Sequence, residues 1–213
     1  MSSLLDLLKN KIDITSVPFS FPGSRLTIYR HSDSGMLYLK LAERLVHVFP
    51  GIESYTKRPP FLDDITFLNA DQQPIPFQVT TQPHALDFST PLGTIQLTFL
   101  DESTLCFHFP QNCTIGLRFK VHAMEWHTNA TEGSIASHRP VQYGSNAHVL
   151  LNQLGDVESY SELTVLFQTG QESAFIFAFG EDTQAMNFPT CDQARSNARR
   201  IWDNWFQKVP EVK

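Results

Sequence analysis

The stretch TIQLTFLDESTLCFHFPQNCTIGLRFKV, Thr94–Val121, decides the fold class. It contains three short segments, 94–99, 104–109 and 115–121, in which every second residue is apolar. Side chains of a strand point alternately to its two faces, so each segment has one apolar face and one more polar face. We therefore expect three consecutive antiparallel strands that form a meander over a shared core.

The same alternation continues in both directions along the chain. Further strands are expected at 26–30, 36–41, 65–68, 77–80, 85–88, 123–127, 148–152, 163–168 and 174–179. Turn-forming residues separate the strands at intervals of about 8–12 residues, which is typical of a β-sandwich or barrel. We predict an all-β protein, a large, supersandwich-like antiparallel β-sandwich over residues 25–180, preceded by an N-terminal segment, 1–24.

The last part of the chain has a helical pattern. After a linker at 181–189, Thr190 and Gln193 fit a capping box, in which each side chain accepts a hydrogen bond from an unpaired backbone amide. Apolar residues then recur at helical spacing, at Ala194, Ala198, Ile201, Trp202, Trp205 and Phe206. We predict an amphipathic connector helix over 190–209, whose aromatic residues Trp202, Trp205 and Phe206 dock onto another domain or subunit.

Composition excludes several kinds of partner. The net charge of −6 argues against binding to nucleic acid, which needs clustered Lys and Arg. No apolar run reaches the roughly 18 residues of a membrane span, and the first ten residues lack the pattern of a signal peptide. The three cysteines have no metal-binding spacing, which is typical of reduced thiols in a cytoplasmic protein. We expect a cytoplasmic protein without a cofactor, a metal or a membrane contact.

Catalytic motifs are scarce in this sequence. There is no Gly-x-Ser-x-Gly turn for a nucleophile and no glycine-rich phosphate loop. Glu125 and His127 occupy alternate positions of an expected strand and share a face, so with a further histidine they offer a second alternative, a small metal-dependent β-sandwich enzyme. We nevertheless predict neither catalytic residues nor metal ligands.

The stretch 128–147 is polar and is expected to be a long loop, a type of segment that often carries function. Amide, guanidinium and aromatic side chains together suit ligands rich in hydroxyl groups. The candidate carbohydrate or domain-interface residues are Trp126, Arg139, Gln142, Tyr143 and Asn146. They support an alternative function, a stand-alone carbohydrate-binding module.

Both ends of the chain resemble one enzyme family. Pro18-Phe19, Gly23-Ser24-Arg25 leading into Leu26–Arg30, and Leu41-Ala-Glu-Arg44 resemble the amino-terminal β-sandwich of bacterial glycosidases related to glycoside hydrolase family 63. The wider group includes trehalase-like and mannosylglycerate-hydrolase-like enzymes. At the other end, Trp202, Trp205, Phe206, Pro210 and Val212 resemble the helical connector that leads into the catalytic domain of these enzymes.

The resemblance implies a role without catalysis for this chain. Such enzymes hydrolyse α-glycosidic bonds with inversion of configuration, using two carboxyl groups, and in the family both belong to an (α/α)6 toroid that follows the connector. The resemblance therefore implies a supporting domain that packs beside an (α/α)6 catalytic domain. It also implies that the 128–147 stretch can contribute to the rim of an oligosaccharide site.

Overall fold

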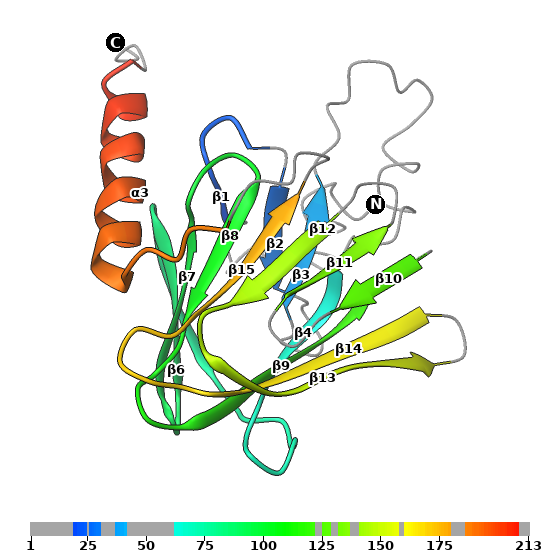
Figure 1. The fold of residues 1–213 in the computed structure, drawn as a ribbon. Coiled ribbons are helices and arrows are strands. Elements are labelled where there is room, and N and C mark those ends of the chain that lie inside the picture. Colours follow the sequence, from blue (N-terminus) through cyan, green and yellow to red (C-terminus); the bar gives the residue numbers. More distant parts are fainter. Residues whose placement is uncertain are drawn as a thin grey trace, which may run out of the picture.

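The computed structural model describes residues 19–24, 26–30, 37–41, 62–121, 125–128, 132–136, 141–157, 160–179 and 186–208. They form two antiparallel sheets that enclose a common core, with one helix outside the larger sheet (Figure 1). The predicted all-β sandwich with a C-terminal helix is confirmed. In this part of the chain, no helix is both long enough and apolar enough to cross a membrane.

The smaller sheet has seven strands in the order β1-β2-β3-β4-β9-β14-β13. Their bounds are Phe19–Ser20, Leu26–Arg30, Leu37–Leu41, Leu62–Leu68, Thr114–Val121, Tyr160–Gln168 and His148–Val157. The larger sheet has eight strands in the order β10-β11-β12-β15-β8-β7-β6-β5. Their bounds are Glu125–Thr128, Glu132–Ala136, Val141–Ser145, Ala174–Phe179, Thr104–His108, Gly93–Phe99, Ala85–Thr90 and Gln78–Gln82.

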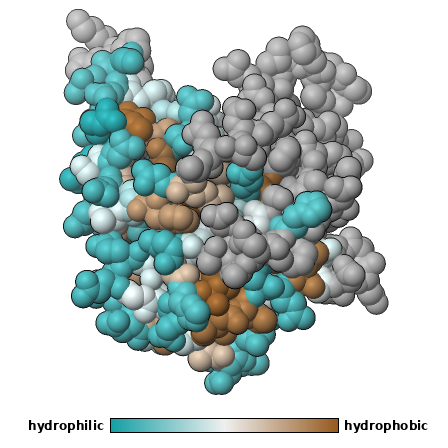
Figure 2. All heavy atoms as spheres, in the orientation of Figure 1, coloured by the Kyte–Doolittle hydropathy of each residue, from teal (hydrophilic) through white to brown (hydrophobic). Residues whose placement is uncertain are grey.

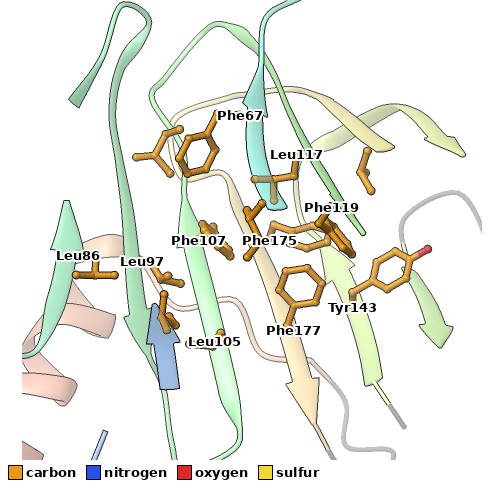
Figure 3. Close-up of a cluster of buried hydrophobic side chains, with 14 of the residues drawn as sticks. Phe67, Leu86, Leu97, Leu105, Phe107, Leu117, Phe119, Tyr143, Phe175 and Phe177 are labelled. Atoms are coloured by element: carbon orange, nitrogen blue, oxygen red, sulfur yellow. The ribbon is translucent and has the colours of Figure 1, made fainter. Parts of the chain in front are cut away.

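Phenylalanine rings join the two sheets across the core (Figure 3). Phe67 of β4 meets Phe107 of β8 with ring centroids 6.3 Å apart, and Phe119 of β9 meets Phe177 of β15 at 5.1 Å. Both pairs are edge-to-face, the arrangement that the charge distribution of aromatic rings favours. The high phenylalanine content of the sequence is thus used to fill the space between the sheets.

The predicted three-strand meander is wrong in its third member. β7 and β8 pair as expected, but β9 lies in the other sheet, between β4 and β14. The chain crosses from one sheet to the other at the turn 110–113. Alternation specifies which face of a strand is buried, and both sheets face the same core, so the pattern could not reveal the crossing.

The long loop expected at 128–147 is also a wrong prediction. This stretch contains β11 and β12, which pair with each other, and β12 continues the larger sheet next to β15. Their sequences, EGSIA and VQYGS, contain glycine and serine and lack a clean alternation of apolar residues. The two-residue strand β1 was missed as well.

Helix α3, Cys191–Phe206, runs along the outer face of the larger sheet and contacts β7 (Figure 1). The predicted capping box is present: the Gln193 amide donates to Thr190 Oγ1 at 3.2 Å, and the Thr190 amide donates to Gln193 Oε1 at 3.0 Å. The small side chains of Ala194 and Ala198 are buried, which lets the helix approach the sheet closely. α3 ends at Phe206, three residues before the predicted end.

Candidate functional site

The last turns of α3 carry an aromatic cluster. The rings of Trp202, Trp205 and Phe206 contact one another, with centroids 5.7 Å, 5.4 Å and 5.3 Å apart. Trp205 and Phe206 are 44% and 53% exposed, whereas Trp202 is half-buried. We call these three residues the aromatic end of α3. Large aromatic side chains exposed side by side are typical of a protein–protein contact.

The first half of α3 is fixed to the sheet by polar contacts. Arg195 Nη2 donates to Gln82 Oε1 at 3.0 Å and to Asp87 Oδ2 at 3.2 Å, which ties the helix to the β5–β6 hairpin. Gln82 in turn donates to Asp87 Oδ2 at 3.0 Å. Before the helix, Met186 and Phe188 pack on Cys106, Ala174 and Ile176, a small apolar cluster separate from the main core. The helix is therefore docked at its start and exposed at its end.

Burial shifts the pKa of four titratable groups, one at the start of α3 and three beneath α3 and the segment before it. Desolvation is the largest cause for each: it raises the pKa of the Cys106 and Cys191 thiols and lowers the pKa of His84 and His108. The two thiols therefore remain protonated, so neither is an activated nucleophile. His84 and His108 were not predicted as site residues, because the alternation places His108 on the polar face of its strand and His84 in a turn.

Of the candidate carbohydrate or domain-interface residues, three have described side chains: Gln142, Tyr143 and Asn146. Tyr143 is buried in the core, and the side-chain amide of Asn146 is used by the fold: Oδ1 accepts from the Ala174 amide at 2.7 Å, and Nδ2 donates to Glu172 O at 2.9 Å. Gln142 is partly buried on β12. Trp126 belongs to β10, but its side chain lies outside the description, as does all of Arg139.

The histidine-based metal site receives no support from the described residues. Glu125 and His127 lie on β10 in the larger sheet, whereas His148 lies on β13 in the smaller sheet, and both histidines are exposed. His122 and His138 fall outside the description. Within the ranges that the structure covers, no three His, Cys, Asp or Glu side chains gather as metal ligands.

Leu150 of β13 is 48% exposed, at an irregularity in the pairing with β14. Figure 2 shows a compact apolar patch at the lower end of the molecule. It lies apart from α3. β13 is an edge strand of its sheet, and such bulges hinder pairing with a further strand.

Comparison with known proteins gives a structural neighbour but no sequence relative. No protein-family model matches the chain, and no curated protein matches it. Among solved structures, the fold is similar to that of a family GH92 inverting mannosidase from Bacteroides thetaiotaomicron, with a TM-score of 0.59 and 10% sequence identity. The match covers 91% of this chain and 33% of the mannosidase chain. The protein thus shares its fold with one part of a larger glycoside hydrolase.

Proposed function

We propose that this chain is a non-catalytic β-sandwich domain of an inverting α-glycosidase related to glycoside hydrolase family 63, and that it supports an (α/α)6 catalytic domain. The aromatic end of α3 is the contact surface. The observation that carries the proposal is the half-docked helix, in which Arg195 contacts the sheet near one end while Trp205 and Phe206 are exposed at the other.

Two further observations support this function. The sandwich fold is shared with a part of an inverting mannosidase, an enzyme that acts on glycosidic bonds, and this chain spans a third of that protein. Several described carboxylates already have structural partners: Asp87 binds Arg195, Glu162 lies 3.9 Å from Arg118, and Asp101 accepts from the Ser103 amide. An inverting enzyme instead needs two free carboxyl groups roughly 6.5–9.5 Å apart, facing a sugar.

Hydrolysis assays on the purified chain test the absence of catalysis. We expect no turnover of p-nitrophenyl α-mannoside or α-glucoside above the buffer rate. Robust turnover by the chain alone, retained through successive purification steps, would overturn the proposal.

The partner is tested in the source organism with an antibody to this chain. We expect the precipitated material to hydrolyse an α-glycoside, either as a longer polypeptide or as a complex with a second subunit. For a complex, the double variant Trp205→Ser/Phe206→Ser is expected to lose the activity-bearing subunit. The matched control, Leu150→Ser, changes an exposed apolar residue away from α3 and is expected to retain it. Native protein that is monomeric at 24.2 kDa and inactive would contradict the proposal.

A further inference from the structure

The contact between the sheet and residues 186–202, which we call the α3 seam, contains several buried polar side chains beside the apolar cluster of Met186 and Phe188. On the sheet side the buried residues of the seam include His84, Gln96, Thr98 and His108. Gln96 and Thr98 lie on β7, opposite His108 and Cys106 of β8, and all four point away from the main core. On the helix side only Ala194 and Ala198 are fully buried. Polar side chains of the sheet therefore lie buried in the seam together with small and apolar side chains of the covering segment.

Several polar atoms of the seam are not satisfied. Gln96 Nε2, Thr98 Oγ1 and Trp202 Nε1 are buried and have no hydrogen-bond partner among the described residues. More than nine in ten buried polar groups in folded proteins do have a partner. Release of the helix would let water reach all three atoms. The docked state therefore includes an unfavourable free energy of desolvation that the released state does not.

Two histidines lie under this segment at different points. His108 Nε2 donates to Pro189 O at 3.0 Å, immediately before the Thr190 cap. His84 lies in the β5–β6 turn, between Gln82 and Asp87, the two residues that hold Arg195. Both side chains are buried.

The charged and titratable neighbours of the two histidines differ. His84 is affected by four charged side chains. Three belong to α3, namely Arg195, Arg199 and Asp203, and the fourth is Asp87 of β6. The charge of Glu172, in the β14–β15 loop, acts on His108. Cys106 Sγ of β8 lies 3.8 Å from the ring nitrogens of His108. A proton on His84 would thus add a third positive charge beside two guanidinium groups.

We infer that residues 186–208 form a pH-sensitive strap, which stays docked while His84 and His108 are neutral and is released from the outer face of β7 and β8 when they are protonated. This inference does not depend on the proposed glycosidase role. If that role holds, the same release would alter how the aromatic end is presented to its partner.

The direction of the pH effect follows from the environment of each ring. Burial, followed by Arg199 and Arg195, lowers the pKa of His84 against the opposing effect of Asp87 and Asp203. Burial also lowers the pKa of His108, against the hydrogen bond to Pro189 O and the charge of Glu172. A released histidine with the ordinary pKa of 6.5 binds a proton more tightly than the docked one. Docking is therefore strongest above pH 6.5 and weakens as the pH falls below that value.

Hydrogen–deuterium exchange of the full chain tests the strap at about pH 7.5 and about pH 5.5, with rates corrected for intrinsic exchange. This window separates histidines from ordinary carboxyl groups, which titrate near pH 4. We expect peptides from 186–206 to lose protection at the lower pH, by at most roughly tenfold per histidine, because pH 5.5 lies one unit below the ordinary histidine pKa of 6.5. Peptides from β8 and β15 are expected to stay protected.

Glutamine variants identify the groups responsible. His84→Gln/His108→Gln is expected to abolish the pH-dependent loss, because glutamine does not titrate and its Nε2 can still donate to Pro189 O. His148→Gln is the matched control, since His148 is exposed on β13, and should behave like wild type. An equal loss of protection in the double variant, or none in wild type, would overturn the inference.

A second measurement covers the case in which the double variant fails to fold. Histidine ring protons are titrated by NMR in wild type and in Ala198→Gln, which places a long neutral side chain at a buried position of the helix. The pKa values of His84 and His108 should rise in Ala198→Gln, because coupling between docking and proton binding is reciprocal. Unchanged values for His84 and His108 in a variant with an exposed α3 would also refute the strap.

Discussion

The Tyr143 hydroxyl donates a hydrogen bond to Asn152 Oδ1 at 3.1 Å and thereby links the two sheets of the sandwich. Tyr143 lies on β12 and is 1% exposed, while Asn152 lies on β13. The tyrosine ring also covers Gly133, its cross-strand partner on β11, so closely that a Cβ at 133 would lie 2.3 Å from the ring. One side chain thus connects β11, β12 and β13.

Tyr143→Phe tests the hydrogen bond between the sheets. The ring keeps its place over Gly133, and only the hydroxyl is lost, so we expect the free energy of unfolding to fall by about 0.5–1.5 kcal/mol. Urea denaturation followed by fluorescence measures the change. In a double-mutant cycle with Asn152→Ala, the two effects should be less than additive. Fully additive effects would show that the contact contributes nothing.

Gly133→Ala tests the close approach of the ring. The new methyl group would overlap Tyr143, so we expect a loss of about 1–3 kcal/mol, as for other overpacked sites. Gly155→Ala on β13 is the matched control, since its nearest neighbour would be the Glu162 carbonyl oxygen at an ordinary 4.0 Å. Equal costs in thermal or urea unfolding would mean that β propensity, and not the ring, sets the requirement for glycine.

The sequence predicted those parts of the fold that depend on local pattern. Twelve expected strand segments match β2 to β10 and β13 to β15, and the Thr190 capping box is present, because alternation and capping act over a few residues. The strands β11 and β12 were missed because their pairing is supported by tertiary contacts such as Tyr143 over Gly133. The sequence pattern also could not predict which sheet contains β9, because β9 pairs with β4 and β14, which are distant in sequence.

Residue type alone does not show whether a polar side chain is available to a ligand. Asn146 has an amide side chain of the kind that binds sugars. In the fold, both its oxygen and its nitrogen already make hydrogen bonds, to the backbone of residues 174 and 172. Conversely, His108 lies on the polar face of β8 and looks exposed in sequence. It is buried only because the segment before α3, a feature about 80 residues away, covers that face.

Thr190→Ala tests the cap of α3. Loss of the hydroxyl leaves the Gln193 amide without its acceptor, so we expect the helix to lose about 1 kcal/mol. Thr190→Ser keeps the acceptor and should cost much less. Hydrogen exchange of the first turn of α3 gives the measurement, and equal exchange in the two variants would contradict the capping role.

The Arg195–Asp87 contact is expected to contribute little to stability despite its 3.2 Å distance. The Arg195 side chain is more than one-third exposed, and ion pairs of this kind are typically worth about 0.2–1 kcal/mol. A double-mutant cycle of Arg195→Gln and Asp87→Asn should therefore give a coupling energy in that range, and the coupling should decrease in high salt. A salt-independent coupling of several kcal/mol would instead make this contact the principal anchor of α3.

Trp205→Glu separates an exposed aromatic end from one covered by the rest of the chain. With 44% of Trp205 exposed, we expect stability to change by no more than about 0.5 kcal/mol, the usual range for surface substitutions. Self-association should decrease, because exposed apolar area promotes contacts between molecules. Sedimentation velocity and urea denaturation measure the two quantities on the same samples. Ala198→Glu places a charge on the buried side of the same helix. It should destabilise the docked helix and should not decrease self-association. If Trp205→Glu were as destabilising as Ala198→Glu, the aromatic end would be part of this domain's own core, and no surface would remain on α3 for a catalytic partner.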